Sequence, residues 1–505
     1  MSNPNILLIL CDQLRGDALG CAGNSIVKTP NIDRLAKSGT HFTQCMITQP
    51  TCTPSRASIL TGCYASTLRS RMVGCYTPDD PRFLPHVLSA KNYHTASIGK
   101  IHLVSQGAEP QAIEQTEGDY FGFQTIDLVN GHGDNCFGPK YTPVLRDKMP
   151  DFEIQKRKRQ KYKPGVKDSH SYELPPEMHS SNYIGDRTVE FLEQTADKPF
   201  FLHVSFPDPH HPFTVPAPYD TMYDPDEMPA PIPPLTETSN VPSFHLDTYF
   251  ARNYRIHNKD KGVDRVIGTK PEPYYEYTLA DWQKTISLYY GMITLLDENV
   301  GRILDTLEST SLADNTLVIF TADHGEYLGD HGLYGKGLPY HPSLNVPLIF
   351  SGPNVQADTQ IDNVATTLDI VPTIYDTAQI AEPEGVQGQS LKSVLNGQEL
   401  AFRKSVLTEN DDDFVPMKMR TLTTNDWKLT YYANEPFGEL YDRKNDPQEL
   451  NNLWNAPSYA ELRTELMNRL LEEVICSFDV ANGRRQKPSP PQAIKWIPKH
   501  NQLKQ

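Results

Sequence analysis

The sequence has no long hydrophobic run, and this absence excludes the usual helical membrane anchors. None of its 505 residues lies in an apolar stretch of the roughly 18 to 20 residues that a transmembrane helix needs. Residues 5–10 are apolar, but no basic region precedes them and no small-residue cleavage site follows. They predict a buried strand rather than a signal peptide. We therefore expect a cytoplasmic protein with no membrane partner, or a periplasmic one if a signal has been removed.

Positive charge is also scarce. The chain has 47 Lys and Arg against 63 Asp and Glu, a formal net charge of −16. Such a field repels phosphate, so we expect no nucleic-acid partner. A small anionic substrate is still compatible with this net charge, because a local cluster of cations can make the potential inside a pocket positive. The eight cysteines match no zinc spacing, and buried reduced thiols are their simplest interpretation, with the exception of Cys52.

The order of strand and helix signals along the chain indicates an α/β protein with a smaller second unit. The chain is too long for one compact core, and strand and helix signals alternate from its start, as in a largely parallel sheet. Strands are predicted at residues 6–10, 95–98, 200–206, 317–320 and 346–350, and helices at 29–36, 55–61 and 279–308.

Two stretches lack regular patterns. Residues 105–180 have an irregular sequence, and the Pro-rich residues 207–245 predict loop over much of their length. We treat about 105–180 and 214–278 as insertions in a catalytic domain of residues 1–380. The basic run Lys156–Arg159, with Lys161 and Lys163 nearby, predicts a solvated loop, a subsite for an acidic substrate, or an oligomer contact; the oligomeric state itself is left open.

The texture of the sequence changes after about residue 380. Residues 420–432 and 438–441 are typical of antiparallel strands, and residues 462–475 of an amphipathic helix. The tail from residue 482 is polar and Pro-rich and predicts an extended chain. These features define a smaller C-terminal subdomain at residues 381–505.

The strongest functional signal is Cys52-Thr53-Pro54-Ser55-Arg56, which precedes a short helical segment closed by Gly62. Pro54 suits the first turn of a helix, so side chain 52 lies at a helix N-terminus, where backbone N–H groups stabilise negative charge. The segment resembles the C-x-P-x-R maturation motif of type I sulfatases, members of the alkaline phosphatase superfamily.

This resemblance implies a fold and a reaction. The fold is alkaline-phosphatase-like: a large mixed, mostly parallel sheet sandwiched by helices, with a smaller C-terminal α+β subdomain that contains an antiparallel sheet. A formylglycine-generating or anaerobic sulfatase-maturating enzyme oxidises Cys52 to formylglycine. Its hydrate attacks sulfur and forms a covalent sulfo-enzyme intermediate, and loss of the second hydroxyl proton then expels sulfate.

A metal site is expected where two strands end. Asp12-Gln13 follows the first predicted strand and Asp323-His324 follows the strand at 317–320, and sites in open α/β sheets form at such strand ends. The resemblance places metal ligands at these four positions, together with the nucleophile at Cys52. Oxygen ligands favour Ca²⁺, whereas the imidazole of His324 and the amide of Gln13, in place of the Asn and Asp of many relatives, also fit Mn²⁺ or Mg²⁺.

Further motifs supply cations and acid–base groups. The segments Gly99–Leu103, Pro209–Phe213 and Gly335–Gly337 resemble the family's G-K-x-H-L, H-x-P and G-K-G motifs. The resemblance implies that Arg56 and Lys100 hold the nucleophile and that His102 is the base. His210 and Lys336 bind the sulfate, as does Lys100, and either of the first two protonates the leaving oxygen. His211 has a weaker claim, and His341 is expected to face the substrate.

These residues predict a sulfatase that hydrolyses sulfate monoesters of sugars or of aryl or alkyl alcohols. The alternative within the superfamily is a phosphonate monoester or phosphodiester hydrolase, because both substrate classes carry one negative charge. An alternative of another class is a non-catalytic carbohydrate-binding protein on a sulfatase fold. The intact set of candidate residues argues against it.

Overall fold

A computed structural model describes residues 3–116, 119–149, 169–172, 175–195, 198–233, 277–398, 403–411 and 418–478. The basic run Lys156–Arg159, most of the second predicted insertion and the C-terminal tail lie outside the described residues. The expectations for these segments stay predictions.

A nine-stranded sheet forms the centre of the molecule. Its strands are β1 (Asn5–Cys11), β2 (Gly39–Met46), β3 (His94–Gly99), β4 (Thr125–Leu128), β6 (Phe200–Phe206), β8 (Thr316–Ala322), β9 (Asn345–Ser351), β10 (Thr359–Ile361) and β11 (Ala365–Thr366). The order is β10-β2-β9-β8-β1-β6-β3-β4, with β11 also paired to β2. Only β9 runs antiparallel to its neighbours, β2 and β8. The predicted mixed, mostly parallel sheet is confirmed.

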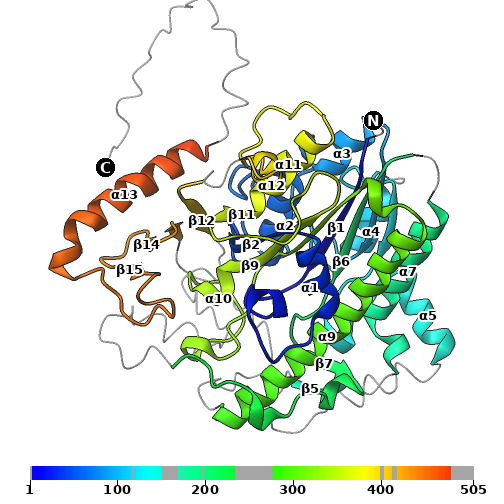
Figure 1. The fold of residues 1–505 in the computed structure, drawn as a ribbon, viewed down its shortest axis with the longest axis horizontal. Helices are drawn as coiled ribbons and strands as arrows, with labels where there is room; N and C mark the ends of the chain where they lie inside the picture. Colours follow the sequence, from blue (N-terminus) through cyan, green and yellow to red (C-terminus); the bar gives the residue numbers. More distant parts are fainter. Residues whose placement is uncertain are drawn as a thin grey trace, which may run out of the picture.

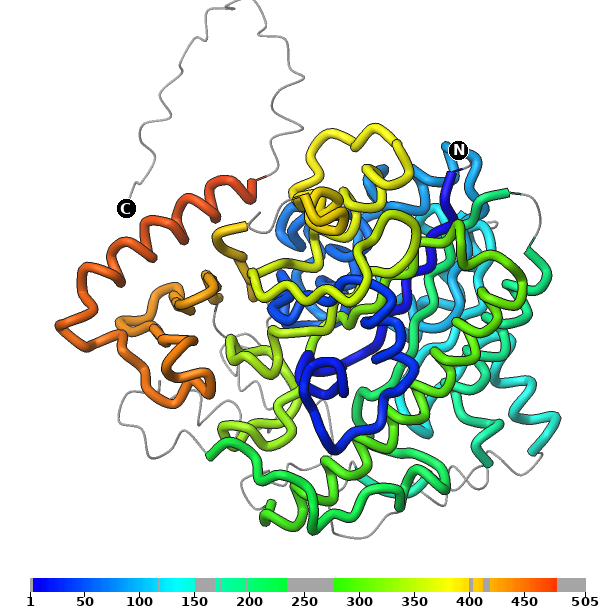
Figure 2. Tube along the Cα trace, in the orientation of Figure 1, coloured from blue at the N-terminus to red at the C-terminus, as the bar shows by residue number. Residues whose placement is uncertain are grey.

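The central strand β1 explains why the sheet is buried. Its sequence is almost entirely apolar and all seven of its residues are buried. Parallel strands with both faces covered by helices have such continuous apolar runs. In Figures 1 and 2 this blue strand runs through the middle of the molecule, with segments from the middle and the later part of the chain on either side.

Two groups of helices pack against this sheet. The first group is α1 (Pro30–Lys37), α7 (Ser180–Gln194) and α9 (Leu279–Ser309), and the second is α2 (Cys52–Thr61), α3 (Leu84–Ser89), α11 (Ile370–Thr377) and α12 (Lys392–Leu395). The long helix α9 begins at a capping box in which Thr278 and Asp281 exchange hydrogen bonds. The helices predicted at residues 29–36, 55–61 and 279–308 are confirmed.

The C-terminal part forms a second, antiparallel sheet. It is a meander of β12 (Val406–Asn410), β13 (Met419–Thr423), β14 (Trp427–Tyr432) and β15 (Gly438–Asp442), covered by α13 (Ala460–Cys476). Figure 1 shows this unit in orange and red beside the main sheet. Residues 420–432 are two strands rather than one, because the turn at 424–426 reverses the chain. The proposed division at residue 380 stays a prediction.

The prediction of irregular structure at residues 105–180 was wrong in part. This stretch contains β4 together with α4 (Glu109–Gln115), α5 (Tyr141–Lys148) and β5 (Ser169–Tyr172). β5 pairs in parallel with β7 (Phe213–Pro216), which lies within the predicted Pro-rich loop. These elements are short and have no regular apolar period, so tertiary pairing rather than local pattern defines them. The one-turn helix α10 (His341–Leu344) precedes β9.

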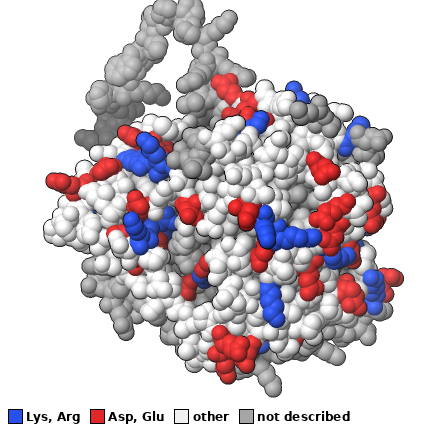
Figure 3. All heavy atoms as spheres, viewed as in Figure 1, with Lys and Arg blue, Asp and Glu red and all other residues white. Residues whose placement is uncertain are grey.

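Charge is spread over the surface. On the face drawn in Figure 3, Lys and Arg side chains are interspersed with Asp and Glu. Among the described residues, no helix combines the length and the apolarity that a membrane crossing requires.

Candidate active site

The site begins where two neighbouring parallel strands end. Cys11, the last residue of β1, is in register with Ala322, the last residue of β8. The residues that follow the two strands, Asp12 and Asp323, therefore lie side by side. The Asp323 N–H donates to the Cys11 carbonyl at 3.1 Å. The Gln13 N–H donates to Asp323 Oδ1, also at 3.1 Å. The strand ends therefore bring both acidic motifs to one edge of the sheet.

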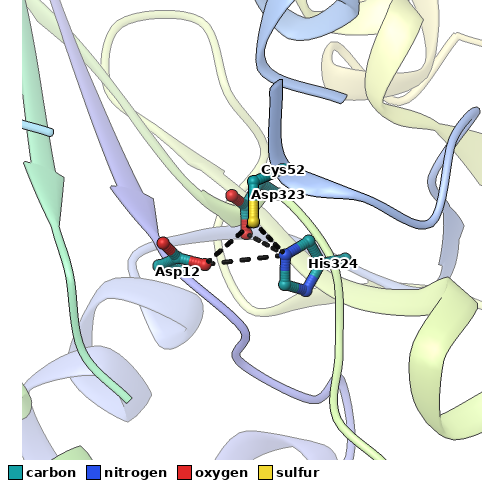
Figure 4. Close-up of side chains that lie close together, drawn as sticks. All are labelled: Asp12, Cys52, Asp323 and His324. Atoms are coloured by element: carbon teal, nitrogen blue, oxygen red, sulfur yellow. Dashed lines mark hydrogen bonds and ion pairs between the residues drawn. The ribbon is translucent and has the colours of Figure 1, made fainter. Parts of the chain in front are cut away.

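Cys52 faces these strand ends from the first residue of α2. Its Sγ lies 3.1 Å from His324 Nε2 and 4.0 Å from Asp12 Oδ1. One ligand atom from each of Asp12, Cys52, Asp323 and His324 lies within 4.8 Å of the others, and all four residues are buried. Figure 4 shows the four side chains converging from the end of β1, the segment after β8 and the start of α2. The structure thus brings four of the five predicted metal-site residues into direct proximity.

Local sequence explains the position of Cys52. Thr51 is extended and α2 starts at the next residue, with Pro54 in its first turn, where a missing N–H costs nothing. The helix ends at Gly62, whose φ of 67° suits glycine. The Ser55 hydroxyl donates to the Asp323 carbonyl, which ties the helix to the end of β8.

Two buried cations neutralise the carboxylates. Arg56 Nε donates to Asp323 Oδ2 at 2.7 Å, and Arg56 Nη2 lies 3.5 Å from Asp12 Oδ2. Lys100 Nζ forms an ion pair with Asp12 Oδ2. Lys100 follows Gly99, where any Cβ would collide with the Ser205 carbonyl oxygen. Burial raises the pKa of Asp12, but Lys100, His210 and Arg56 more than reverse this, so that pKa lies well below its ordinary value.

A second set of polar groups meets at Lys336, which contacts Cys52. Lys336 Nζ donates to Cys52 Sγ at 3.2 Å, to Gln13 Oε1 at 2.7 Å and to His210 Nε2 at 2.9 Å. Burial raises the pKa of the Cys52 thiol, but Lys336, His324 and Lys100 outweigh it, and the resulting pKa lies below its ordinary value. Residue 52 is therefore held in an electropositive pocket inside an acidic protein.

A model of the sulfatase family matches residues 4–380, most of the chain. The chain belongs to the sulfatase family. A model of the C-terminal part of N-sulphoglucosamine sulphohydrolase matches residues 329–475. The alkaline-phosphatase-like fold implied by the sequence is thereby confirmed.

Relatives across the sulfatase family cover nearly the whole chain. An arylsulfatase of Clostridium perfringens is 28% identical over 93% of this chain and 94% of its own length. An N-acetylglucosamine-6-O-sulfatase of Bacteroides thetaiotaomicron is 27% identical over 93% and 86%. The crystal structure of a phosphonate monoester hydrolase of Agrobacterium radiobacter superposes with a TM-score of 0.79, at 28% identity over 94% of this chain and 96% of that one.

Members of the sulfatase family carry a divalent metal, and the residues present here fit one. Two carboxylates, one imidazole and the Cys52 thiol meet in a buried cluster whose ligand atoms all lie within 4.8 Å of one another, as the ligands of a single ion do. The Nδ1 of His324 lies 3.0 Å from the Gly325 carbonyl, to which it donates, so Nε2 is left as the acceptor that faces the cluster. This donor set suits Ca²⁺ or Mn²⁺.

The cations that act on His102 are Lys100 and Arg56. The backbone of His102, with φ of 58°, is fixed by an N–H donated to Glu109 Oε2 at 3.1 Å. The ring is buried and its Nδ1 has no hydrogen-bond partner among the described residues. Burial and the charge of Lys100 and Arg56 hold the pKa of His102 well below its ordinary value. The ring is therefore neutral, as a base must be.

His341 lies apart from the cluster around Cys52. Its backbone N–H donates to Glu449 Oε2 at 2.9 Å. Its side chain lines a cavity of about 370 Å³ together with Arg15, Asp17 and His331, and none of the four residues in Figure 4 lines that cavity. The predicted contact of His341 with the substrate stays a prediction.

Sequence reasoning missed two residues of this site and gave too little weight to a third. His132 Nε2 accepts from Lys100 Nζ at 2.7 Å, and its ring stacks on His210 with centroids 3.6 Å apart. Glu326 accepts a hydrogen bond from Gln13, and His211 Nδ1 lies 2.9 Å from Gln13 Nε2. The only available signals were the glycines on both sides of His132 and the position of Glu326 directly after the Asp323-His324-Gly325 segment.

Proposed function

We propose that this protein hydrolyses sulfate monoesters, with a nucleophile made by oxidation of Cys52 to formylglycine and with one divalent metal. The observation that supports this most is the position of Cys52. It starts a helix, lies 3.1 Å from His324 Nε2 and receives a hydrogen bond from Lys336 Nζ. A thiol that served only as core packing would not need candidate metal ligands and an ammonium group within contact distance.

The metal would be held by Asp12, Asp323 and His324, with Gln13 as a further oxygen donor. Bound there, a divalent ion withdraws electron density from sulfate oxygens and lowers the pKa of a hydroxyl on residue 52. The carboxylates favour Ca²⁺, and the imidazole also accommodates Mn²⁺ or Mg²⁺.

The chain's own cations bind and orient the sulfate. Lys336 contacts both Cys52 and His210, and a ring nitrogen of His210 lies within 4.8 Å of the Asp12 carboxylate, so both side chains are close enough to contact sulfate oxygens and the leaving oxygen. The Lys336 ammonium has a proton to give to the leaving oxygen, and His210 can give one after its Nε2 has taken it from Lys336. Lys100 and Arg56 keep Asp12 and Asp323 ionised and in place.

The neutral imidazole of His102 serves as the base that removes a hydroxyl proton from residue 52. Fixed donors and acceptors around the sulfate stabilise charge in the transition state without reorganisation. The substrate class is a sulfated sugar or an aryl or alkyl sulfate. The names of the arylsulfatase and the N-acetylglucosamine-6-O-sulfatase among the relatives support this range. We further propose a cytoplasmic location and activation by a formylglycine-generating or anaerobic sulfatase-maturating enzyme.

A second candidate is hydrolysis of phosphonate monoesters or phosphodiesters. The TM-score of 0.79 with a phosphonate monoester hydrolase favours it. Matched 4-nitrophenyl sulfate and 4-nitrophenyl phenylphosphonate separate the two, because leaving group and net charge are the same. We expect the larger kcat/KM with the sulfate, and a larger value with the phosphonate would replace the proposal by this candidate. A non-catalytic carbohydrate-binding role is disfavoured, because the nucleophile, cations and ligand cluster are all assembled.

The proposal is tested by Cys52→Ala in protein co-expressed with a maturation enzyme. We expect turnover of aryl sulfate to fall by at least about 10³-fold, since only binding and electrostatics remain. Cys476→Ala, at an exposed position on α13, is the matched control and should keep full activity. Mass analysis of the peptide that contains residue 52 checks the modification. Near-wild-type activity in Cys52→Ala, with the same thermal unfolding, would overturn the mechanism.

A further inference from the structure

The backbone of Gln13 has an uncommon conformation and is held by hydrogen bonds at both its N–H and its carbonyl. It has a φ of 68°, which non-glycine residues rarely adopt outside functional sites. Its N–H donates to Asp323 Oδ1 at 3.1 Å and its carbonyl accepts from the Tyr289 hydroxyl at 2.8 Å. The residue is also completely buried. Its side chain therefore leaves the backbone in a fixed direction, between the metal cluster and the loop after β8.

The hydrogen bonds around the Gln13 amide fix which end is oxygen. Lys336 Nζ is only a donor, so the amide atom that it contacts at 2.7 Å must be the carbonyl oxygen. The carboxylate of Glu326 is only an acceptor, so the amide atom that faces it must be the NH₂ group. The same NH₂ group lies 2.9 Å from His211 Nδ1. The oxygen thus faces Lys336, which also contacts Cys52, and the nitrogen faces Glu326.

Glu326 is itself immobile. Its side chain is fully buried, and its Oε1 accepts the backbone N–H groups of Leu328, at 3.1 Å, and of Gly335. Gly335 directly precedes Lys336, so one carboxylate ties the Asp323–Leu328 loop to the loop that carries the ammonium. The other oxygen, Oε2, is the one that Gln13 contacts. Nothing in this arrangement lets Glu326 turn away if the group at position 13 changes.

We propose that Glu326 is a positioning residue that fixes the Gln13 amide with its oxygen toward Lys336, where it can serve as a metal ligand, and that it selects glutamine over a carboxylate at position 13. This inference rests on the proposed function only in that the cluster holds a metal ion. A glutamate at position 13 has the shape of glutamine but brings a second buried carboxylate against Glu326 Oε2. Two like charges at hydrogen-bond distance are strongly unfavourable unless a proton is drawn between them from a neighbour such as His211, whose Nδ1 lies 3.9 Å from Glu326 Oε2.

The pair can be exchanged with its hydrogen bonds kept, provided that His211 Nδ1 donates to the new carboxylate instead of accepting from the Gln13 amide. In Gln13→Glu/Glu326→Gln, the amide oxygen introduced at position 326 still accepts from Leu328 and Gly335, and the new NH₂ group donates to the carboxylate introduced at position 13. In Glu326→Gln alone, the Gln13 amide must turn over to avoid two facing NH₂ groups. It then presents NH₂ rather than oxygen to Lys336 and the metal. Each single change should therefore harm the site, and the double change should restore it.

The experiment measures metal affinity rather than turnover. Metal-free wild type, Gln13→Glu, Glu326→Gln and the double variant are titrated calorimetrically with CaCl₂ and with MnCl₂. Loss of an orienting group behind a metal ligand costs about 10- to 100-fold in affinity, and we expect such a weakening in each single variant. The double variant should lie within about threefold of the wild type, because its hydrogen bonds are complete. Thermal unfolding of the metal-free proteins should show the same pattern.

Glu409→Gln is the matched control. Glu409, on β12, is a buried carboxylate that accepts the Ser66 backbone N–H at 3.2 Å and lies 3.8 Å from Arg420 Nε. This variant should lose stability but keep the wild-type metal affinity. Wild-type affinity in Glu326→Gln, or a double variant that fails to fold or combines both losses, overturns the proposal. A wild type that binds metal and shows this rescue but does not hydrolyse sulfate esters would overturn the proposed function alone.

Discussion

At the scale of single residues, the site depends on buried charges that cancel in pairs. Arg56 contacts both Asp323 and Asp12, and all three side chains are fully buried. Burying such groups is costly, so the pairs hold the site's geometry more than they add to its stability. Removing one member is different, because a charge then stays buried without its partner.

We therefore expect Arg56→Gln to lower the free energy of unfolding by about 3 to 5 kcal/mol. Arg34→Gln is the control, because Arg34 is 42% exposed and pairs with Asp305 and Glu308 at the surface. There the loss should be below about 1 kcal/mol. Urea denaturation measures both variants. Equal losses of unfolding free energy in the two variants would show that the buried ion pair matters no more for stability than the surface pair does.

The role of His102 gives a second prediction at this scale. His102→Ala should lower kcat for an aryl sulfate by about 10²- to 10⁴-fold, the usual range for a general base, and leave KM nearly unchanged. His41→Ala, on β2, is the control: a buried histidine whose pKa burial lowers to about 4 and whose loss should affect stability only. A large rise in KM with little change in kcat would instead make His102 a substrate-binding residue.

At the scale of elements, the sequence predicted the strand and the helices with strong local patterns, including those that hold active-site residues. The apolar run of β1, the Pro-started helix α2 and the long periodic α9 have strong local patterns, and the structure contains all three. β4 was missed because its four residues include two polar ones, Thr125 and Asp127. Its pairing with β3, which no local pattern encodes, makes it a strand.

The C-terminal sheet contains a buried carboxyl group that should make stability depend on pH. Glu439, on β15, is fully buried, and its Oε1 accepts from the hydroxyls of Tyr432, at 2.9 Å, and Tyr340, at 3.3 Å. Burial raises the pKa of Glu439 to about 7, against the hydrogen bonds and Lys428, which lower it. The folded protein therefore holds this proton more tightly than the unfolded chain does.

The stabilisation that protonated Glu439 provides is complete below the pKa of this group in the unfolded chain, about 4.3, and is lost as the pH rises through about 7. Glu439→Gln should flatten this fall, which we expect to reach roughly 3 kcal/mol between pH 5 and 8. Glu465→Gln, exposed on α13, should leave the wild-type profile unchanged. The check is urea denaturation at several pH values. A profile that is the same in Glu439→Gln and wild type would contradict the assignment.

At the scale of the whole molecule, the site joins residues that are far apart in the chain. Family motifs in the sequence indicated Asp12, Cys52 and Asp323. Nothing local indicated that Glu326 would meet Gln13, 313 residues away, or that His132 would stack on His210. Such contacts arise only when β1, β8 and the loops after them are placed by the sheet. Glu326 and His132 were therefore beyond the reach of the sequence.

The same convergence would make the proposed metal a link between distant parts of the fold. Asp12, Asp323 and His324 follow β1 and β8, and Cys52 starts α2, so an ion bound by them connects the sheet to that helix. Ligands that bind only the folded state stabilise it by about 2.7 kcal/mol at 100 times Kd. Chelation should therefore lower the midpoint of thermal unfolding by several degrees, and CaCl₂ or MnCl₂ should restore it in proportion to the logarithm of the concentration.

Asp323→Asn keeps the shape of the site but removes one ligand charge and the ion pair with Arg56, so its midpoint should respond little to either metal. Asp314→Asn, at an exposed position before β8, is the matched control and should respond as the wild type does. The measurement is thermal unfolding of chelator-treated protein across a metal titration. A midpoint in the wild type that stays constant over the whole titration would show that no ion links β1, β8 and α2. Equal responses in Asp323→Asn and wild type would place the ion elsewhere in the molecule.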